Sequence, residues 1–234
     1  MAMKSYSQPD FSIVFFDLEA TGLSVTDEIT QIAAKCGDAS HNQYVIPEQP
    51  IPKAITNMTG ISMINKQMYY NGNPVDGVSP AIAVSAFISF LESVGGKVVL
   101  ISHNCFNSDG PTLAGLVDQL DMLQRFKRIV IGFSDSLPLM RKSLPNERPT
   151  GKGYKLSELA KEFFGSSKGA HNALEDVIML EKLICHPQIN ISADDIINSR
   201  QIVGAMIHKY KNRLNSYNQS LRYDDDFYYI VGFD

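Results

Sequence analysis

The sequence lacks several features that would place a protein in a particular class at once. It contains no tryptophan and 3 cysteines among 234 residues, and no cysteine stands in a Cys-x-x-Cys or Cys/His spacing typical of structural zinc. No apolar run approaches the ~20 residues that span a bilayer, and the N-terminal residues lack the apolar segment of a signal peptide. We therefore expect no membrane association and a reducing location, in the cytoplasm or the nucleus.

An excess of positive charge is also missing. The 21 Lys and Arg residues against 25 Asp and Glu residues give a formal net charge of −4, which argues against a surface that binds polyanions without specificity. A nuclease is not excluded, because an acidic metal site loses its negative charge when cations bind and phosphate contacts can be local. With 44% hydrophobic residues, the chain is ordinary for a globular protein, and its length suffices for one large domain.

The sequence does have a pair of acids at the end of an apolar run. Residues 11–16 are rich in β-branched and aromatic side chains and predict a buried strand. Asp17 and Glu19 follow, and because successive strand side chains alternate between faces, these two carboxylates share one face. At about 4 Å apart they would repel each other by about 4 kcal/mol at an effective dielectric constant of about 20. A divalent cation would relieve this repulsion, although the two acids alone are equally typical of a solvated strand end.

The rest of the chain predicts alternating strands and helices. A β-α-β order in the middle predicts a parallel pair of strands. The tail after residue 214 has no assignable pattern and is either a disordered end or an edge strand. The other expected elements are a hairpin over 28–36 and 41–46, a loop-rich stretch to residue 78, a helix over 80–94 capped by Ser79, a strand over 97–102, a helix opened by Pro111, a strand over 128–133, a short helix capped by Asp135, helices beginning at Leu156 and Ala173, and one helix from Ser192 to Leu214.

Three segments bring polar residues to the ends of these elements. Asp17 and Glu19 end the first strand, Asp109 follows the next strand of the predicted parallel pair, and His171 with Asp176 opens a late helix. Each segment alone is weak evidence, but their order and spacing together are a strong signal. They resemble the three motifs of the DEDDh, or DnaQ-like, 3′-to-5′ exonucleases over roughly residues 11–185. The motifs read Asp17-Leu18-Glu19-Ala20-Thr21-Gly22-Leu23, His103-Asn104 with Asp109, and His171-x-x-x-x-Asp176.

Within that family the sequence is most similar to the TREX-type enzymes. The turn at Thr59-Gly60-Ile61 and the segment Gly153-Tyr154-Lys155-Leu156 ahead of the third motif carry this similarity. The chain also resembles the exonuclease-like C-terminal region of the PML protein, for example across Phe15-Phe16-Asp17-Leu18, but it retains the acids that the mammalian region has lost. It departs from the TREX-type pattern at Ser108, where those enzymes have a tyrosine.

The resemblance implies an α/β fold of the RNase H-like (DnaQ-like exonuclease) class, with a mixed five-stranded sheet flanked by helices. The exonuclease domain would cover 11–187, and 188–234 would form a C-terminal helix and a tail that pack on the same domain. By the family's pattern, Asp17, Glu19 and Asp176 hold one ion, with Asp17 bridging, and Asp109 helps to hold a second.

The expected cofactor is therefore a pair of Mg²⁺ ions, with Mn²⁺ as a substitute, because hard carboxylate ligands suit both metals. His171 has the role of general base, since a free imidazole with a pKa of about 6.5 can accept a proton near neutral pH.

The resemblance also places the terminal nucleotide of a substrate. Leu23 would act as an apolar wedge against it. The expected nucleotide-binding residues are Ala20, Thr21, Leu23, Ile61, His103 and Asn104. For His103, a hydrogen-bonded structural role is the commoner alternative. Basic residues that are candidates for phosphate contacts, or else form solvated faces, are Arg125, Lys127, Arg128, Lys152 and Lys155.

These features predict a metal-dependent 3′-to-5′ exodeoxyribonuclease that releases 5′-mononucleotides from single-stranded DNA or duplex 3′ ends. The preference for DNA rests on the TREX-type resemblance alone. An RNA exonuclease with the same site and a catalytically inactive nucleic-acid- or protein-binding module are the alternatives. TREX-type relatives pair through an edge strand, so the resemblance leaves room for a homodimer.

Overall fold

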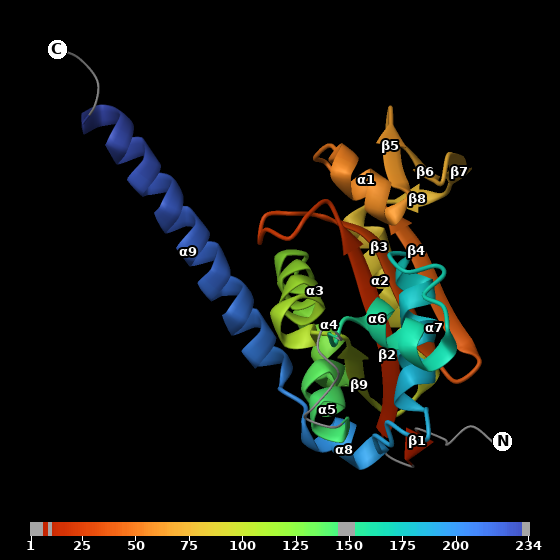
Figure 1. The fold of residues 1–234 in the computed structure, drawn as a ribbon. Coiled ribbons are helices and arrows are strands. Elements are labelled where there is room, and N and C mark those ends of the chain that lie inside the picture. The colour runs from red at the N-terminus through yellow and green to blue at the C-terminus, as the bar shows by residue number, and fades with distance from the viewer. Residues whose placement is uncertain (1–6, 9–10, 145–152, 231–234) are drawn as a thin grey trace.

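The computed structural model describes residues 7–8, 11–144 and 153–230. A mixed β-sheet runs through the centre of this part of the chain, with helices on both faces (Figure 1). The strands lie in the order β10-β9-β2-β3-β4-β8, and β1 pairs with β2 as the seventh strand. They are β1 (Ser7–Gln8), β2 (Phe11–Ala20), β3 (Ile29–Cys36), β4 (Ala39–Val45), β8 (Gly77–Val78), β9 (Lys97–Ser102) and β10 (Val130–Asp135).

The helices of the described residues surround this sheet. Three of the caps expected from the sequence are present, because the side chains of Ser79, Asp135 and Ser192 each accept a hydrogen bond from a backbone N–H of the first helical turn. None of these helices is long and apolar enough to cross a membrane. They are α1 (Lys53–Thr59), α2 (Pro80–Val94), α3 (Asp109–Gln119), α4 (Leu123–Ile129), α5 (Ser136–Ser143), α6 (Leu156–Phe164), α7 (Ala173–Ile184), α8 (Ala193–Asn198) and α9 (Val203–Ile230), with a 3₁₀ turn over Cys105–Asn107.

Strand β2 lies in the middle of the sheet and determines where the candidate site forms. It pairs in parallel with β9, which pairs in parallel with β10, and it pairs antiparallel with β3. The carboxyl ends of β2, β9 and β10 therefore meet at one edge of the sheet. Every residue from Ile13 to Phe16 is at most 1% exposed, as expected for a central strand covered on both faces.

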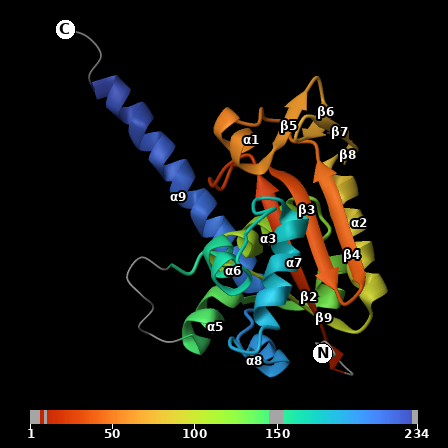
Figure 2. The ribbon, with the colours of Figure 1, turned by 45° about the vertical axis from the view of Figure 1, so that its right-hand side comes forward.

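The alternation along β2 divides the hydrophobic core into two halves. Val14 and Phe16 face the half that α2, α3, α4 and the first turns of α9 fill. Ile13 and Phe15 face the other half, which α5 to α8 fill. Figure 2 shows α7 lying along the second face, over β2 and β3. Because Asp17 continues the face of Ile13 and Phe15, its side chain lies on the side that α7 covers.

The predicted mixed sheet with flanking helices is confirmed, and it is larger than the five strands expected. The five expected strands are β10, β9, β2, β3 and β4, while the two-residue strands β1 and β8 extend the sheet to seven. Both additions are too short to be read from a period-two pattern.

The stretch expected to be loop-rich contains regular structure. After α1, a second sheet forms from β5 (Ile61–Ile64), β6 (Gln67–Tyr70) and β7 (Asn73–Val75). Two-residue turns join these strands, and Asn65, Lys66, Asn71 and Gly72 all have positive φ there. Positive φ at both central residues is the property of the tight hairpin turn that matches strand twist. The Asn-rich composition therefore indicated hairpins rather than irregular loops.

Two further predictions were wrong in their boundaries. The strand expected over 128–133 begins at Val130, because the preceding residues form α4, whose Phe126 is fully buried. The single helix expected after Ser192 is two helices, since Gln201 leaves the helical path and exchanges two backbone hydrogen bonds with Phe133 of β10, at 2.7 and 2.8 Å. The second of these helices, α9, continues to Ile230 through residues that were expected to be a disordered end or an edge strand.

Candidate active site

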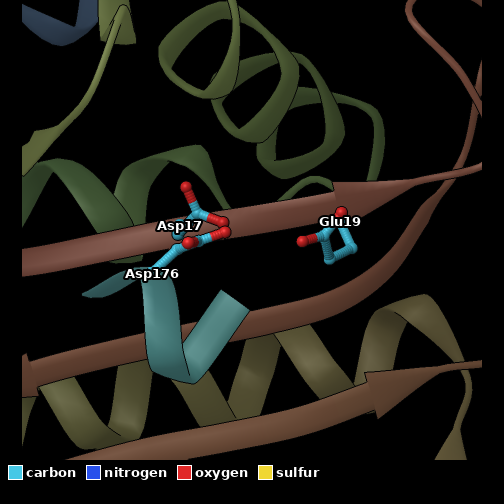
Figure 3. Close-up of side chains that lie close together, drawn as sticks. All are labelled: Asp17, Glu19 and Asp176. Carbon is cyan, nitrogen blue, oxygen red and sulfur yellow. The ribbon is translucent and has the colours of Figure 1, made fainter. Parts of the chain in front are cut away.

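Three of the predicted acids meet at the carboxyl edge of the sheet. Asp17 and Glu19 come from β2 and Asp176 from the first two turns of α7, and each offers a carboxylate oxygen within 4.8 Å of the other two. Figure 3 shows the three side chains together between β2 and α7. Segments nearly 160 positions apart in the sequence are thus brought to one point, as the motif spacing predicted.

Asp109 is close enough to this cluster to act on it electrostatically. It stands at the first position of α3, after the 3₁₀ turn that follows β9, and is 6% exposed. Burial is the main cause that raises the pKa of Asp17 well above its usual range, and the charge of Asp109 is the next, ahead of those of Asp176 and Glu19. The four predicted carboxylates therefore form one electrostatic group.

The pKa values of the other acids shift in the same direction. Burial, with the charges of Asp176 and Asp109, raises the pKa of Glu19 to about 8. Burial raises the pKa of Asp109 to about 7, with a contribution from Asp135. Burial also raises the pKa of Asp176 to about 6, although the hydrogen bond from the His171 amide opposes the shift. Such shifts indicate that the cluster contains too little positive charge of its own.

The donor set of this cluster fits divalent cations. Only carboxylate oxygens converge there, and none of the ion pairs made by described residues includes one of these four acids. Oxygen-only, acidic donor sets suit hard ions such as Mg²⁺ and Mn²⁺ rather than zinc, which prefers nitrogen and sulfur. Asp17, Glu19 and Asp176, three of the residues that would hold the expected metal, therefore lie close enough together to share an ion.

A buried glutamine fixes the helix that carries Asp176. The side chain of Gln31, on β3, is fully buried; its amide group donates to Asn42 at 2.8 Å, and its oxygen accepts a hydrogen bond of 3.1 Å from the N–H of Ala173. Asn172 caps the same helix by accepting from Glu175. Sequence reasoning missed this role of Gln31, although a glutamine inside an otherwise apolar strand was a signal that could have revealed it.

His171 lies at the rim of the cluster. Its backbone N–H donates to Asp176 at 2.9 Å, and its φ of 70° places it in the left-handed region. That conformation is uncommon for a residue with a side chain and is typical of turns and functional sites. The imidazole is exposed and lines a cavity of about 420 Å³, together with Asp176 and His103.

The acids lie between two cavities of different character. The cavity beside His171, which we call the basic cavity, contains Arg141 and Lys155, and the guanidinium of Arg141 lies 5.6 Å from the ring centre of Tyr154. The second, of about 270 Å³, is lined by Glu19 and Asp109 and by exposed apolar side chains, and we call it the apolar cavity. Its lining also includes Leu23, Ile55, Met58, Asn107 and Arg213.

Comparison with known families identifies the fold family. Residues 11–163, well over half of the chain, match the family described as the Exuperantia RNase H-like domain. The chain belongs to this family. The matched part of this RNase H-like domain contains Asp17, Glu19 and Asp109, whereas His171 and Asp176 lie beyond it.

Individual proteins also resemble this RNase H-like domain. Protein PML of Mus musculus is 24% identical over 181 residues, which is 77% of this chain and 17% of that protein. Protein PML of Homo sapiens is 24% identical over 174 residues, 74% of this chain and 17% of its own length. The chain thus spans less than a fifth of these relatives.

Solved structures of E. coli exonuclease I have the same fold. The zinc-bound form of its complex with single-stranded DNA has a TM-score of 0.58 and 19% identity, and the match covers 75% of this chain and 40% of that one. Another exonuclease I structure also has a TM-score of 0.58, with 18% identity over 88% of this chain and 46% of the other. These comparisons confirm the RNase H-like, exonuclease-type fold expected from the sequence.

The structure distributes the expected nucleotide-binding residues unevenly around the site of this RNase H-like domain. Ala20 and Leu23 line the apolar cavity, and Asn104 lines both cavities. Ile61 is fully buried in β5 and is in the lining of neither cavity, whereas Met58 and Ile55 of the neighbouring helix α1 line the apolar cavity.

Thr21 and His103 have structural partners. Thr21 is 2% exposed and its hydroxyl donates to Asp27 at 3.2 Å and accepts from the N–H of Glu28, which closes the loop after β2. His103 contacts the hydroxyl of Ser136 at 2.9 Å and the carbonyl of Tyr154 at 2.7 Å. Because a carbonyl only accepts, Nε2 of His103 carries the proton, and burial lowers the pKa of this imidazole.

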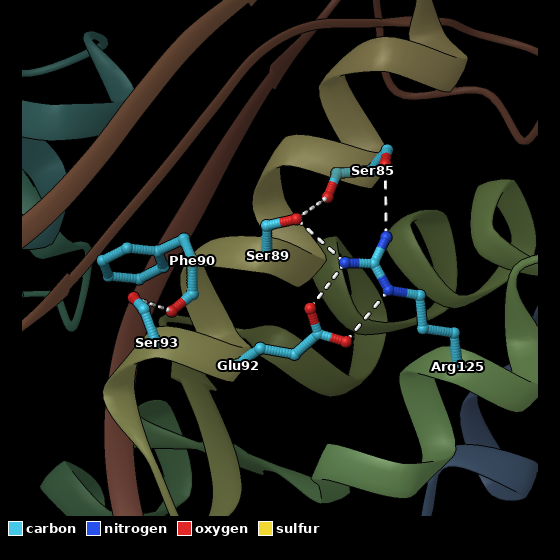
Figure 4. Close-up of polar contacts among 6 residues, drawn as sticks. All are labelled: Ser85, Ser89, Phe90, Glu92, Ser93 and Arg125. Carbon is cyan, nitrogen blue, oxygen red and sulfur yellow. Dashed lines mark hydrogen bonds and ion pairs between the residues drawn. The ribbon is translucent and has the colours of Figure 1, made fainter.

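Among the basic candidates for phosphate contacts, Lys155 lines the basic cavity. Arg125 is held elsewhere: its guanidinium donates to Glu92 at 2.6 and 2.9 Å and to Ser85 and Ser89, which joins α4 to α2 (Figure 4). Lys127 and Arg128 are exposed in the last turn of α4. Lys152 lies outside the described residues. The arginine of the apolar cavity, Arg213, was not foreseen, since nothing in the sequence connects α9 to the motifs.

Proposed function

We propose that this protein is a metal-dependent 3′-to-5′ exonuclease that shortens DNA from its 3′ end and releases 5′-mononucleotides. One observation carries the proposal: the carboxylates of Asp17, Glu19 and Asp176 converge within 4.8 Å, and Asp109 adds its charge to them. A group of half-buried or buried acids with no cationic partner is unfavourable unless it serves to bind cations. The grouping at the end of a central strand therefore supports a catalytic rather than a structural role.

In this proposal Asp17, Glu19 and Asp176 hold one divalent ion, and Asp109 helps to hold a second. When bound, such ions make water nucleophilic near neutral pH and neutralise the charge that develops on the entering and leaving oxygens. The cluster supplies four carboxylates whose formal charge two dications would balance. A phosphodiester could then approach the cluster without net repulsion.

His171 acts as the general base in this proposal. Its imidazole lines the basic cavity while its own N–H binds Asp176, so the ring stands next to the cluster without being one of its ligands. A ring nitrogen accepts the proton of the attacking water, and solvent at the exposed rim takes the proton away. The turn at residues 165–172, with Gly169 and His171 both at positive φ, orients the ring.

The apolar cavity accepts the terminal nucleoside. Leu23 is 91% exposed and Met58 is 47% exposed, and both line this cavity beside Glu19 and Ala20. Large apolar side chains exposed at a site rimmed by polar residues are typical of ligand contact, since a base can cover them. The fold similarity to exonuclease I, which has been solved with single-stranded DNA, supports DNA as the substrate.

Digestion of labelled oligonucleotides tests the proposal. A single-stranded DNA labelled at its 5′ end should shorten progressively from its 3′ end with Mg²⁺ or Mn²⁺ and remain intact in EDTA. Asp17→Asn should reduce the rate by at least about a thousandfold, because it removes the acid at the centre of the cluster, while the circular dichroism spectrum stays unchanged. Failure of the wild-type chain to shorten DNA or RNA would refute a nuclease, and faster digestion of a matched RNA would replace DNA as the substrate.

A further inference from the structure

Helix α9 forms part of the apolar cavity although it lies outside the residues that match the family. The match ends at residue 163, whereas α9 begins at Val203 and supplies Arg213 to the cavity wall opposite the loop after β2. Figure 1 shows the first half of α9 lying beside α3 and its remainder extending away from the body of the molecule. The part of the helix that reaches the site is thus the part that is packed.

Close packing fixes this part of α9 against α3. Gly115 of α3 leaves room for the ring of Tyr210, because any side chain at position 115 would clash with that ring. The Tyr210 hydroxyl accepts a hydrogen bond of 2.7 Å from Gln119, and Lys211 forms an ion pair of 2.8 Å with Asp118. These contacts fall on the turn just before Arg213, so they set the position of its backbone.

A second basic residue of α9 attaches the helix to the loop after β9. The ammonium of Lys209 lies 4.9 Å from the ring centre of Phe106 and donates to the Phe106 carbonyl at 3.4 Å. Arg213 follows one helical turn later on the same side, next to Asn107 and Ser108 of the same loop, which also line the cavity. Lys209 and Lys211 thus both have partners within the fold, and Arg213 is exposed toward the cavity.

The charge of the apolar cavity makes Arg213 distinctive. Its wall contains the carboxylates of Glu19, Asp27 and Asp109, and among the described residues that line it Arg213 is the one with a positive charge. Asp27 is occupied within its own loop, where it accepts hydrogen bonds from the N–H of Ser24 and the hydroxyl of Thr21. The guanidinium of Arg213 therefore has no role in closing that loop.

We propose that Arg213 binds a phosphate of the substrate strand next to the terminal nucleotide, so that the C-terminal helix completes the substrate site. This inference rests on the proposed nuclease function. A guanidinium presents a planar set of donors that matches two phosphate oxygens at once, and it offsets the negative wall that a phosphodiester strand would otherwise meet. The contact positions the strand, and it carries no base sequence information.

Binding and kinetics of Arg213 variants test this inference. In the Asp17→Asn background, which prevents digestion, fluorescence anisotropy with a labelled single-stranded DNA should give a dissociation constant about tenfold higher for Arg213→Ala, with Arg213→Lys in between. The slope of log K against log salt should fall by about 0.7, the value for one phosphate contact on a single strand. In the otherwise wild-type chain, Arg213→Ala should raise KM and leave kcat unchanged.

Controls separate this inference from the proposed function. Lys211→Ala removes a positive charge two residues away from Arg213 on the same helix. The ammonium of Lys211 pairs with Asp118 and does not line the apolar cavity, so the Lys211→Ala variant should bind DNA like the parent. Equal binding by Arg213→Ala and the parent would overturn the inference while leaving the nuclease intact. A loss that depends on the base composition of the oligonucleotide would also overturn it, because it would place Arg213 on a base edge. A parent chain that binds neither DNA nor RNA would overturn both proposals.

Discussion

The two cavities beside the acid cluster border different acids and differ in their other side chains: Glu19 and Asp109 line the apolar cavity, whereas Asp176 lines the basic cavity. The apolar cavity offers Leu23 and Met58 to a ligand, and its lining carries three acids against the charge of Arg213. The basic cavity offers Arg141 and Lys155, together with the imidazole of His171. Asn104, which has a φ of 60°, is common to both linings.

Because of this difference, each cavity suits a different part of a nucleic-acid strand. An uncharged base and sugar fit beside the exposed apolar side chains, where Arg213 is proposed to bind one adjacent phosphate, while the rest of the charged backbone fits the cavity that contains Arg141 and Lys155. If the proposed function holds, the bond to be broken lies over the acids between them. The cavity on the His171 side should then determine the rate of the chemical step, and the cavity on the Leu23 side should determine how well a strand end is held.

Among the substitutions that test the difference between the two cavities, His171→Ala should have the largest effect. His171→Ala should lower kcat by about 10²- to 10⁴-fold, the usual contribution of a positioned general base, with little change in KM. The measurement is steady-state digestion of single-stranded DNA with Mg²⁺ over a range of pH.

His208→Ala is the matched control, because His208 is exposed on α9 and bonds to Asn212. It should digest DNA at the wild-type rate. An unchanged kcat for His171→Ala would show that the imidazole is not the general base. It would also contradict the functional distinction between the two cavities.

The acid cluster predicts how stability depends on pH. The pKa values of Glu19, Asp109 and Asp176 are raised to about 8, 7 and 6, so the folded chain binds more protons than the unfolded chain between about pH 4 and pH 8. Stability therefore falls as pH rises through this window. The metal-free chain should lose on the order of a few kcal/mol of unfolding free energy between pH 5 and pH 8, measured by urea denaturation.

Two comparisons check the cause of that loss. Mg²⁺ should restore stability at pH 8, where the acids are ionised, and should have little effect at pH 5. Asp17→Asn should stabilise the metal-free chain at pH 8 because it removes one of the repelling charges. A metal-free chain whose stability is flat from pH 5 to pH 8 would contradict the description of the four acids as one coupled group.

Gln31 is the residue through which the sheet positions one side of the site relative to the other. Gln31→Met keeps a similar volume but removes the acceptor for the Ala173 N–H, so α7 should shift and carry Asp176 with it. We expect kcat to fall by roughly tenfold, because small displacements of catalytic groups are costly. Gln43→Met on the neighbouring strand is the control, since the Gln43 side chain donates to backbone carbonyls of Tyr44 and Asp76 and should leave kcat unchanged.

The smallest expected effects come from two substitutions that each remove a side chain from one cavity, and they test directly whether the cavities differ. Leu23→Ala should raise KM by roughly three- to tenfold, equally at low and high salt, because it removes apolar contact with a base. Arg141→Ala should raise KM by a similar factor at low salt and less at high salt, because it removes a charge. Identical salt dependence of the two variants would show that the cavities do not differ in the way proposed.

Arg125→Ala is the control for Arg141→Ala. Its guanidinium is held by Glu92, Ser85 and Ser89 of α2, so its loss should lower stability slightly and leave the salt dependence of KM unchanged. Leu23 is almost fully exposed, so its truncation should not change the melting temperature.

Local patterns in the sequence were sufficient for the framework of the fold. The apolar run at 11–16 predicted a buried central strand, and Asp17 and Glu19 do lie on one face of it. The caps at Ser79, Asp135 and Ser192 were identifiable because capping depends on a side chain and the backbone only a few residues away. The grouping of Asp176 with the strand acids followed from motif order and spacing, which record a long-range arrangement indirectly.

Other features depend on contacts between distant segments, and no local pattern reports them. Ile61 is fully buried in the fold, and Met58 of α1 lines the apolar cavity instead. Gln201 interrupts the C-terminal helical region because β10 offers it a strand partner.

By itself, then, the sequence determined the strand that carries the first acids, the caps at Ser79, Asp135 and Ser192, and the set of candidate acids and the histidine. Only the tertiary structure decided that His103 is a buried hydrogen-bonding residue, that Gln31 anchors the helix of Asp176, and that Arg213 faces the cavity beside Glu19. The physical reason is the sequence separation over which each effect acts. Propensity, alternation and capping act within a few residues. Burial, cavity walls and coupled pKa values arise where segments far apart in the chain exclude water together.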